Sequence, residues 1–213
     1  GTSVANLSRI KNLQQLVKNK ILSGHRKIIV VVSAMSGVTN DLVKQYKKID
    51  SDINKPEYDV ILSTGEQYSS ALISTFLNKN GVRSRSILGW QIPIITDNKF
   101  SQARIERIDT EKILKLFKKF NVLVVAGFQG ISPEGRITTL GRGGSDTSAV
   151  AMAVALKSKI CEIYSDVEGI FSSDPRVVRD AKKIKNITYE EILEMASLGS
   201  KVLHPRSVEL AMK

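Results

Sequence analysis

The chain has 213 residues and a formal net charge of +11, the balance of 32 basic and 21 acidic side chains. This length suits one α/β domain with a sizeable core, and the longest apolar runs are far too short to span a membrane. The single cysteine, Cys161, excludes an internal disulfide and is typical of a reducing compartment, so we expect a cytoplasmic protein. The lysines are scattered over several expected helices without interleaved aromatics. This distribution argues for solvated helix faces and against nucleic acid as a partner.

Short β-branched runs alternate with helical stretches along the chain, which indicates an α/β fold built on a largely parallel sheet. We expect helices over residues 3–22, 38–49, 58–77, 110–120, 146–157 and 189–197, and a last helix after Pro205. We expect strands over residues 27–32, 82–87, 122–126 and 160–164. Exposed antiparallel strands or hairpins are expected over residues 100–108 and 130–139.

The burial of the strands follows from their residue patterns. Residues 27–32 and 122–126 are continuous apolar runs, which predicts strands buried on both faces. Residues 82–87 alternate between apolar and polar side chains, which is typical of a strand nearer an edge. The strand over residues 160–164 would place Cys161 in the core as a small packing residue.

The stretch LGRGGSDTSA, residues 140–149, is the most informative local sequence. Its glycines allow positive φ angles and close approach of a ligand, and Ser145 and Asp146 are good helix N-cap residues. A loop that ends at a helix N-terminus can bind an anion, and Arg142 adds a planar cation for a carboxylate or phosphate. Taken alone, the stretch also fits a surface turn before an ordinary capped helix.

Four segments place small polar residues after a strand or turn and before a helix: SAMSGVTN (33–40), STGE (63–66), GRGGSD (141–146) and SDVEGIFSSDPR (165–176). In an open parallel sheet, ligands bind outside the carboxyl ends of the strands. No segment matches the P-loop pattern of nucleotide-binding proteins. The glycine stretch fits a dinucleotide fingerprint poorly, because Asp146 stands where the last glycine belongs and a hairpin precedes it.

These segments, together with GTSVANL (1–7), GFQG (127–130) and KVLHP (201–205), resemble in this order the signature blocks of the aspartokinase catalytic domain, within the amino-acid kinase family. The resemblance covers essentially the whole chain. It implies one catalytic domain over residues 1–213 with a carbamate kinase-like fold, a three-layer αβα sandwich around a mostly parallel sheet. It also implies transfer of the ATP γ-phosphoryl to the β-carboxylate of L-aspartate, the first step toward lysine, threonine and methionine.

On the aspartate side, the resemblance implies six contact residues: Ser33, Thr39, Glu66, Arg142, Ser145 and Asp146. Arg142 would clamp a substrate carboxylate, while Ser145 and Asp146 would reach the ammonium or hold the loop. On the nucleotide side, it implies Ser165, Asp166, Phe171, Asp174, Arg176 and Lys201. Arg176 and Lys201 would face the phosphates, and Phe171 stands where many family members have tyrosine.

Phosphoryl transfer depends mainly on positioning and charge neutralisation. In these terms, the resemblance implies catalytic roles for Arg142, Asp146 and Lys201. Mg²⁺ would arrive with ATP and keep waters in its coordination shell, so we expect no metal ligand from the protein. His25 and His204 are expected to be structural.

The resemblance also implies segments beyond this sequence. It implies an opening strand with a phosphate-contacting lysine ahead of Gly1, and C-terminal regulatory domains after Lys213. Loss of a preorganised cation can lower a rate by roughly 10²–10³-fold, so a catalytically impaired nucleotide-binding fragment is one alternative. Another family activity, on acetylglutamate, glutamate or a nucleoside monophosphate, is a second. A homo-oligomer is also left open.

Overall fold

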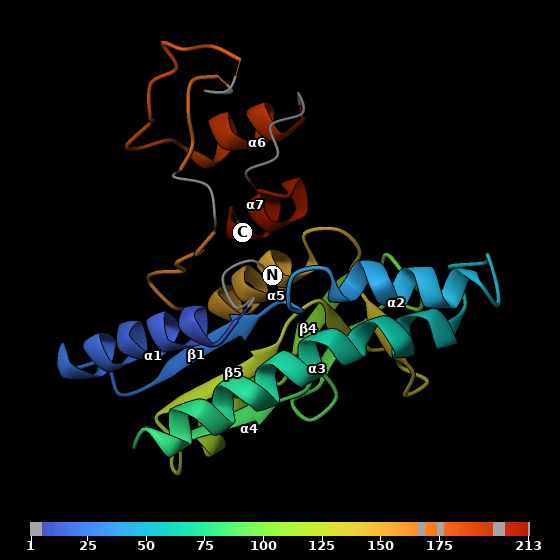
Figure 1. Cartoon of the computed structure of the whole chain (residues 1–213), viewed down its shortest axis with the longest axis horizontal. Helices are drawn as coiled ribbons and strands as arrows, with labels where there is room; N and C mark the ends of the chain where they lie inside the picture. The colour runs from blue at the N-terminus through green and yellow to red at the C-terminus, as the bar shows by residue number, and fades with distance from the viewer. Residues whose placement is uncertain (1–5, 166–168, 174–176, 198–202, 213) are drawn as a thin grey trace.

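The computed structural model describes residues 6–165, 169–173, 177–197 and 203–212 (Figure 1). Its first sheet is parallel and has the strand order β1-β5-β2. The strands are β1 (Ile28–Val32), β5 (Val122–Ala126) and β2 (Ser84–Ile87). The predicted parallel α/β architecture is therefore confirmed, and β2 lies at an edge as its alternating pattern indicates.

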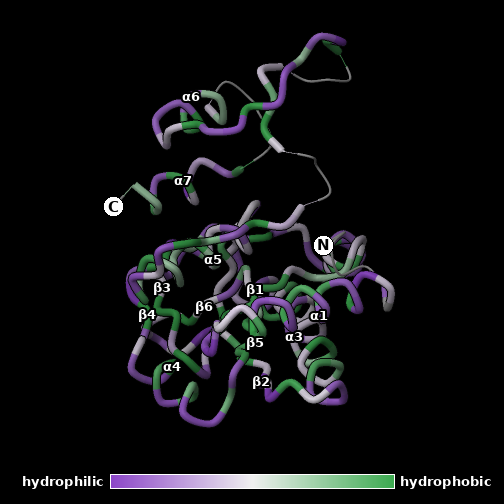
Figure 2. Tube along the Cα trace, turned by 90° about the vertical axis from the view of Figure 1, so that its left-hand side faces the viewer, coloured by the Kyte–Doolittle hydropathy of each residue, from purple (hydrophilic) through white to green (hydrophobic). Residues whose placement is uncertain are grey.

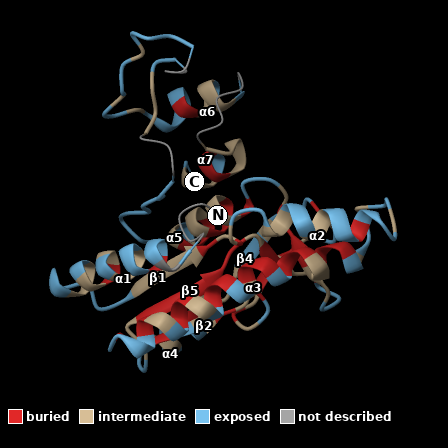
Figure 3. Ribbon diagram, in the orientation of Figure 1, coloured by how far each residue is buried: buried red, intermediate tan, exposed pale blue. Residues whose placement is uncertain are grey.

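Helices cover both faces of this sheet: α1 (Leu7–Leu22) and α3 (Pro56–Lys79) on one, α4 (Thr110–Leu116) and α5 (Gly144–Ala155) on the other. The central strand β5 explains the arrangement, because its side chains alternate between the faces. Val122 and Val124 belong to the core cluster with α1 and α3, whereas Leu123 and Val125 belong to the cluster with α4 and α5. All five residues of β5 are buried (Figure 3). The three-layer αβα arrangement follows directly.

A second sheet has the order β4-β3-β6-β7 and joins β3 (Ile94–Thr96), β4 (Ile105–Ile108), β6 (Gln129–Ile131) and β7 (Ile137–Thr139). The strands β6 and β7 form the predicted hairpin around Pro133 and Gly135, but its expected exposure was wrong. Gln129, Thr138 and Thr139 are buried because α3 packs against this hairpin.

The strand β1 is less buried than its apolar sequence predicts. Four of its five residues are half-buried, and Val32 is the one fully buried residue. Within the described residues, β1 pairs with β5 along one edge, and no strand pairs with its other edge. The expectation of a strand buried on both faces therefore holds for β5 and is wrong for β1.

The C-terminal part of the chain extends away from the two sheets (Figures 1 and 2). The helices α6 (Tyr189–Ser197) and α7 (Pro205–Ala211) form as predicted, with α7 packed between α5 and α6. Residues 160–164 form no strand, and Cys161 is exposed, so both predictions were wrong. The exposure of Ile160 and Tyr164 has the same cause, because this stretch joins neither sheet.

The helix α2 (Val38–Lys47) follows β1 and packs against α3. The start of α3 adds a small cluster to the core, in which Tyr46 and Tyr58 meet edge to face with ring centroids 5.0 Å apart. None of the helices in the described part of the chain is both long and apolar enough to cross a bilayer.

Candidate active site

The carboxyl ends of β1 and β5 carry the loops that the sequence analysis singles out. The Gly127 N–H donates to the Val32 carbonyl at 3.0 Å, which joins the ends of the two strands. A Cβ at Gly127 would lie 2.9 Å from Ser145 Oγ and 3.0 Å from Ser145 Cα. Glycine therefore permits β5 to end against the first turn of α5. This places the glycine loop at the carboxyl edge of the parallel sheet, where ligands bind in open α/β folds.

The glycine loop itself turns through two left-handed residues on either side of Arg142. Gly141 has φ +78° and Gly143 has φ +67°, and Gly143 is the N-cap of α5. No side chain caps this helix, and Ser145 and Asp146 lie inside its first turn. Their predicted N-cap role was therefore wrong. The first N–H groups of a helix have no partner within it, and they favour a bound anion. Arg142 is exposed beside them.

Glu66 lies in the middle of α3 and is 4% exposed. Its Oε1 accepts a hydrogen bond of 2.9 Å from the Ala34 N–H, at the start of the SAMSGVTN turn. Its Oε2 is buried and has no hydrogen-bond partner among the described residues. Burial raises the pKa of this carboxyl to about 7, although the bond from Ala34 acts in the opposite direction. The half-satisfied carboxylate is suited to accept hydrogen bonds from a cationic ligand.

Gly65 explains how Glu66 reaches this turn. A Cβ at Gly65 would lie 2.7 Å from Ala34 Cβ and 3.3 Å from Val38 Cγ1, so α3 and the turn approach more closely than another residue allows. The STGE block lies within α3, so the expectation that it precedes a helix was wrong. Thr64 is exposed, and its hydroxyl donates to the Ile61 carbonyl of its own helix.

Ser33 and Thr39 flank the same turn. Ser33 follows β1 directly and Thr39 is in the first turn of α2, whose N-cap Gly37 has φ +86°. Both side chains are half-buried. The fold thus brings Ser33 and Thr39 to the turn that Glu66 holds.

Asp146 is half-buried in the first turn of α5, and burial raises the pKa of its carboxyl while nearby His204 lowers it. His204 is the N-cap of α7, and its Nδ1 accepts from the Arg206 N–H at 3.3 Å. Arg206 in turn donates from Nη1 to the Leu140 carbonyl at 3.2 Å. His204 also packs against the glycine loop, because a Cβ at Gly143 would lie 2.5 Å from His204 Cβ.

The nucleotide half of the predicted site is less fully described. Asp166, Asp174, Arg176 and Lys201 lie outside the described residues. Ser165 is exposed, and half-buried Phe171 forms a single β-bridge with Lys183. Among the described residues, no cluster of three or more potential ligands that could hold a metal ion is present.

One buried carboxylate next to the site is absent from the sequence predictions. Asp59 in the first turn of α3 is fully buried, and it accepts hydrogen bonds from the Ser101 N–H, the Thr139 N–H and the Thr139 hydroxyl. An acidic residue there would ordinarily complement the helix dipole at the surface. The signal that could have revealed it is its spacing of seven residues from Glu66, which puts both carboxylates on one face of α3.

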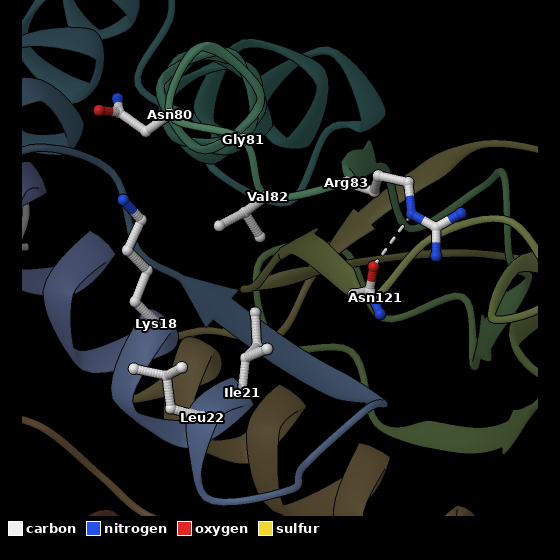
Figure 4. A pocket seen from close by; sticks show the side chains of 8 residues that line it. All are labelled: Lys18, Ile21, Leu22, Asn80, Gly81, Val82, Arg83 and Asn121. Atoms are coloured by element: carbon white, nitrogen blue, oxygen red, sulfur yellow. Dashed lines mark hydrogen bonds between the residues drawn. The ribbon is translucent and has the colours of Figure 1, made fainter.

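Two surface cavities lie away from these residues. A cavity of about 320 Å³ lies near the amino-terminal ends of β2 and β5, where the Arg83 Nε donates to Asn121 Oδ1 at 3.2 Å (Figure 4). Lys18 and Ile21 of α1 line its other wall. This is the opposite edge of the sheet from the glycine loop.

Comparison with known proteins defines the class of protein to which this fold and these loops belong. The sequence profile of the amino acid kinase family matches residues 1–213. The chain therefore belongs to the amino acid kinase family.

Within that family the chain is similar to aspartokinases. It is 50% identical over 216 residues to an aspartokinase from Rickettsia felis, with 100% of this chain and 54% of that protein covered. The chain thus spans about half the length of the curated relatives it matches.

Two solved structures of aspartokinases are also similar to this chain. The crystal structure of aspartate kinase from Synechocystis has a TM-score of 0.84 and 47% identity, and the match covers 99% of this chain and 35% of that one. E. coli aspartokinase III in complex with aspartate and ADP has a TM-score of 0.86 and 27% identity, over 100% of this chain and 58% of that one.

Proposed function

We propose that this chain is the catalytic domain of an ATP:L-aspartate 4-phosphotransferase of the cytoplasm. In the reaction, a β-carboxylate oxygen of aspartate attacks the γ-phosphorus of ATP and the bond to ADP breaks, which gives 4-phospho-L-aspartate. Support comes from the similarity to aspartokinases, one of which is described with aspartate and ADP bound.

The observation that carries the proposal is the carboxylate of Glu66. It is buried and half-satisfied, with Oε2 free of any described partner. A ligand ammonium beside Oε2 would favour the ionised form and offset the desolvation that raises the pKa. L-Aspartate offers this ammonium together with two carboxylates, for which Arg142 and the uncapped start of α5 are suited.

We assign roles to the remaining predicted residues on the same basis. Ser33 and Thr39 complete the aspartate pocket, Ser145 and Asp146 hold the loop or the ammonium, and Arg142 grips a carboxylate. On the nucleotide side we assign Ser165, Asp166, Phe171, Asp174, Arg176 and Lys201, with Lys201 neutralising phosphate charge. Magnesium would be carried by the ATP phosphates and would supply further charge neutralisation.

The test is a phosphotransferase assay with ATP, Mg²⁺ and L-aspartate, in which the acyl phosphate is trapped as a hydroxamate. Because the family resemblance implies a lysine ahead of Gly1, the assay uses this chain and a version extended by the residues encoded upstream. We expect hydroxamate with L-aspartate from the extended version. A substrate panel of acetylglutamate, glutamate and nucleoside monophosphates is the control. Turnover of one of these instead of aspartate, or no binding of either substrate, would overturn the proposal.

A further inference from the structure

We propose that Asp59 is a positioning residue that fixes the start of the glycine loop, so that Arg142 is presented to the substrate. The inference rests on the proposed function only for the identity of that substrate. Asp59 touches no ligand in this account and acts through Ser101 and Thr139.

The contacts of Asp59 converge on the end of β7. Its Oδ2 accepts from the Thr139 N–H at 2.7 Å, and its Oδ1 accepts from the Thr139 hydroxyl at 2.7 Å. Thr139 is the last residue of β7, three positions before Arg142. A carboxylate on α3 therefore holds the end of the strand directly before the glycine loop.

Ser101 gives Asp59 a second hold on the same loop. Its N–H donates to both carboxylate oxygens, at 2.9 and 3.0 Å, and its φ is +64°. Its carbonyl oxygen would be 3.1 Å from a Cβ at Gly141, so the Ser101 backbone forms the wall against which Gly141 turns. Asp59 thus anchors the glycine loop and the segment that packs on it.

The burial of Asp59 makes this arrangement costly to lose. The side chain is fully buried, and no basic side chain in the described part of the chain forms an ion pair with it. Burial raises its pKa, whereas the hydrogen bonds from Ser101 and Thr139 lower it. Removal of the carboxylate would leave those buried backbone N–H groups without an acceptor, and each such group carries a desolvation penalty.

The two buried carboxylates of α3 therefore have complementary positions. Glu66 holds the turn after β1 through the Ala34 N–H, and Asp59, two helical turns earlier, holds the loop after β7. One rigid helix thus sets the separation between the Ala34 turn and the Arg142 loop. Binding sites gain precision when such supports stand on helices and strands.

The test compares Asp59→Ala with Asp59→Asn and with Glu57→Ala in the extended version of the chain. Glu57 is the matched control, because it is an exposed carboxylate in the same helical turn, and its ion pair with Arg136 lies at the surface. Asn can still accept from the two backbone N–H groups through its oxygen and donate to the Thr139 hydroxyl, so it should restore function. We expect Asp59→Ala to raise the aspartate KM about tenfold while the ATP KM stays within about twofold.

A second readout does not depend on activity. Trypsin cleavage after Arg142, measured by mass spectrometry relative to cleavage after Lys157 beyond the far end of α5, reports the order of the loop itself. We expect this ratio to rise in Asp59→Ala and to stay unchanged in Asp59→Asn and Glu57→Ala. If Asp59→Ala fails to fold, Thr139→Val replaces it, with Thr139→Ser as its control.

The outcomes separate the two proposals. A raised cleavage ratio with a selective rise in the aspartate KM supports the role of Asp59. A raised ratio in a protein that phosphorylates no aspartate still supports it, and only the proposed function fails. An unchanged ratio, or a raised ratio with both KM values unchanged, would overturn the positioning role.

Discussion

The aspartate half and the nucleotide half of the predicted site are held by different parts of the molecule. Glu66, Ser145 and the turn at Ala34 are supported by α3, α5 and the ends of β1 and β5. On the nucleotide side, the segment of Phe171 has its backbone contacts with residues 182–184 of the same C-terminal stretch. The difference teaches that the loops assigned to aspartate are held by long-range contacts among the sheets, α3, α5 and α7, whereas the described contacts around Phe171 are local.

The largest expected effect is on the aspartate half, where the charge on Glu66 should make the free energy of unfolding depend on pH. Its pKa is about 7 in the folded chain and 4.5 in the reference state, so folding favours the protonated form. The stabilising protonation is fully present below a pH of about 4.5 and is lost as the pH rises through about 7. The free energy of unfolding should fall by about 3 kcal/mol over that range, and Glu66→Gln should lack the decline.

Urea unfolding at a series of pH values measures this difference. Thr64→Ala, a change at an exposed position of the same helix that removes no titratable group, is the control and should follow the shape of the wild-type curve. Parallel curves for the wild type and Glu66→Gln would mean that the buried carboxyl does not titrate as described.

A smaller effect is expected at Gly65. An alanine there places a Cβ within 2.7 Å of Ala34 Cβ, and such overpacking costs about 1–3 kcal/mol, partly offset by the better helix propensity of alanine. Gly65→Ala should therefore destabilise the chain by about 1 kcal/mol and raise the aspartate KM. Thr64→Ala, at the exposed neighbouring position, should change stability by less than about 0.5 kcal/mol. Stabilisation by Gly65→Ala would show that α3 and the turn are not in close contact.

The smallest effect is expected on the nucleotide side. Phe171→Tyr adds the hydroxyl that many family members carry, and one added hydrogen bond should lower the ATP KM by about threefold. The aspartate KM should not change. Steady-state kinetics with each substrate varied in turn measure both KM values. A change in the aspartate KM alone would show that Phe171 does not belong to the nucleotide side.

Much of this fold could be predicted from local sequence. The apolar run of β5 predicts a buried strand, which is confirmed because β1 and β2 pair with β5 on both sides, and the helix predicted over residues 58–77 forms as α3. The strand β3 (Ile94–Thr96) was not predicted, because it is short and follows Pro93. The predicted strand over residues 160–164 was wrong because a short β-branched run does not by itself supply a pairing partner.

The site likewise has features that local sequence reveals and features that only long-range contacts create. The glycine loop and the STGE block were recognisable as motifs, but the role of Gly65 depends on contact with a turn 31 positions earlier in the chain. Asp59 was missed for a similar reason, because its partner Thr139 is 80 residues away. Sequence patterns indicate which residues are unusual, whereas long-range packing determines which of them meet.

The most direct test of the aspartate half is the pair of KM values of Arg142→Ala, measured in the extended version of the chain. Loss of a charged hydrogen-bond donor should raise the aspartate KM by roughly tenfold to hundredfold and leave the ATP KM within about twofold. A rise in the ATP KM with an unchanged aspartate KM would contradict the account and assign the glycine loop to the nucleotide.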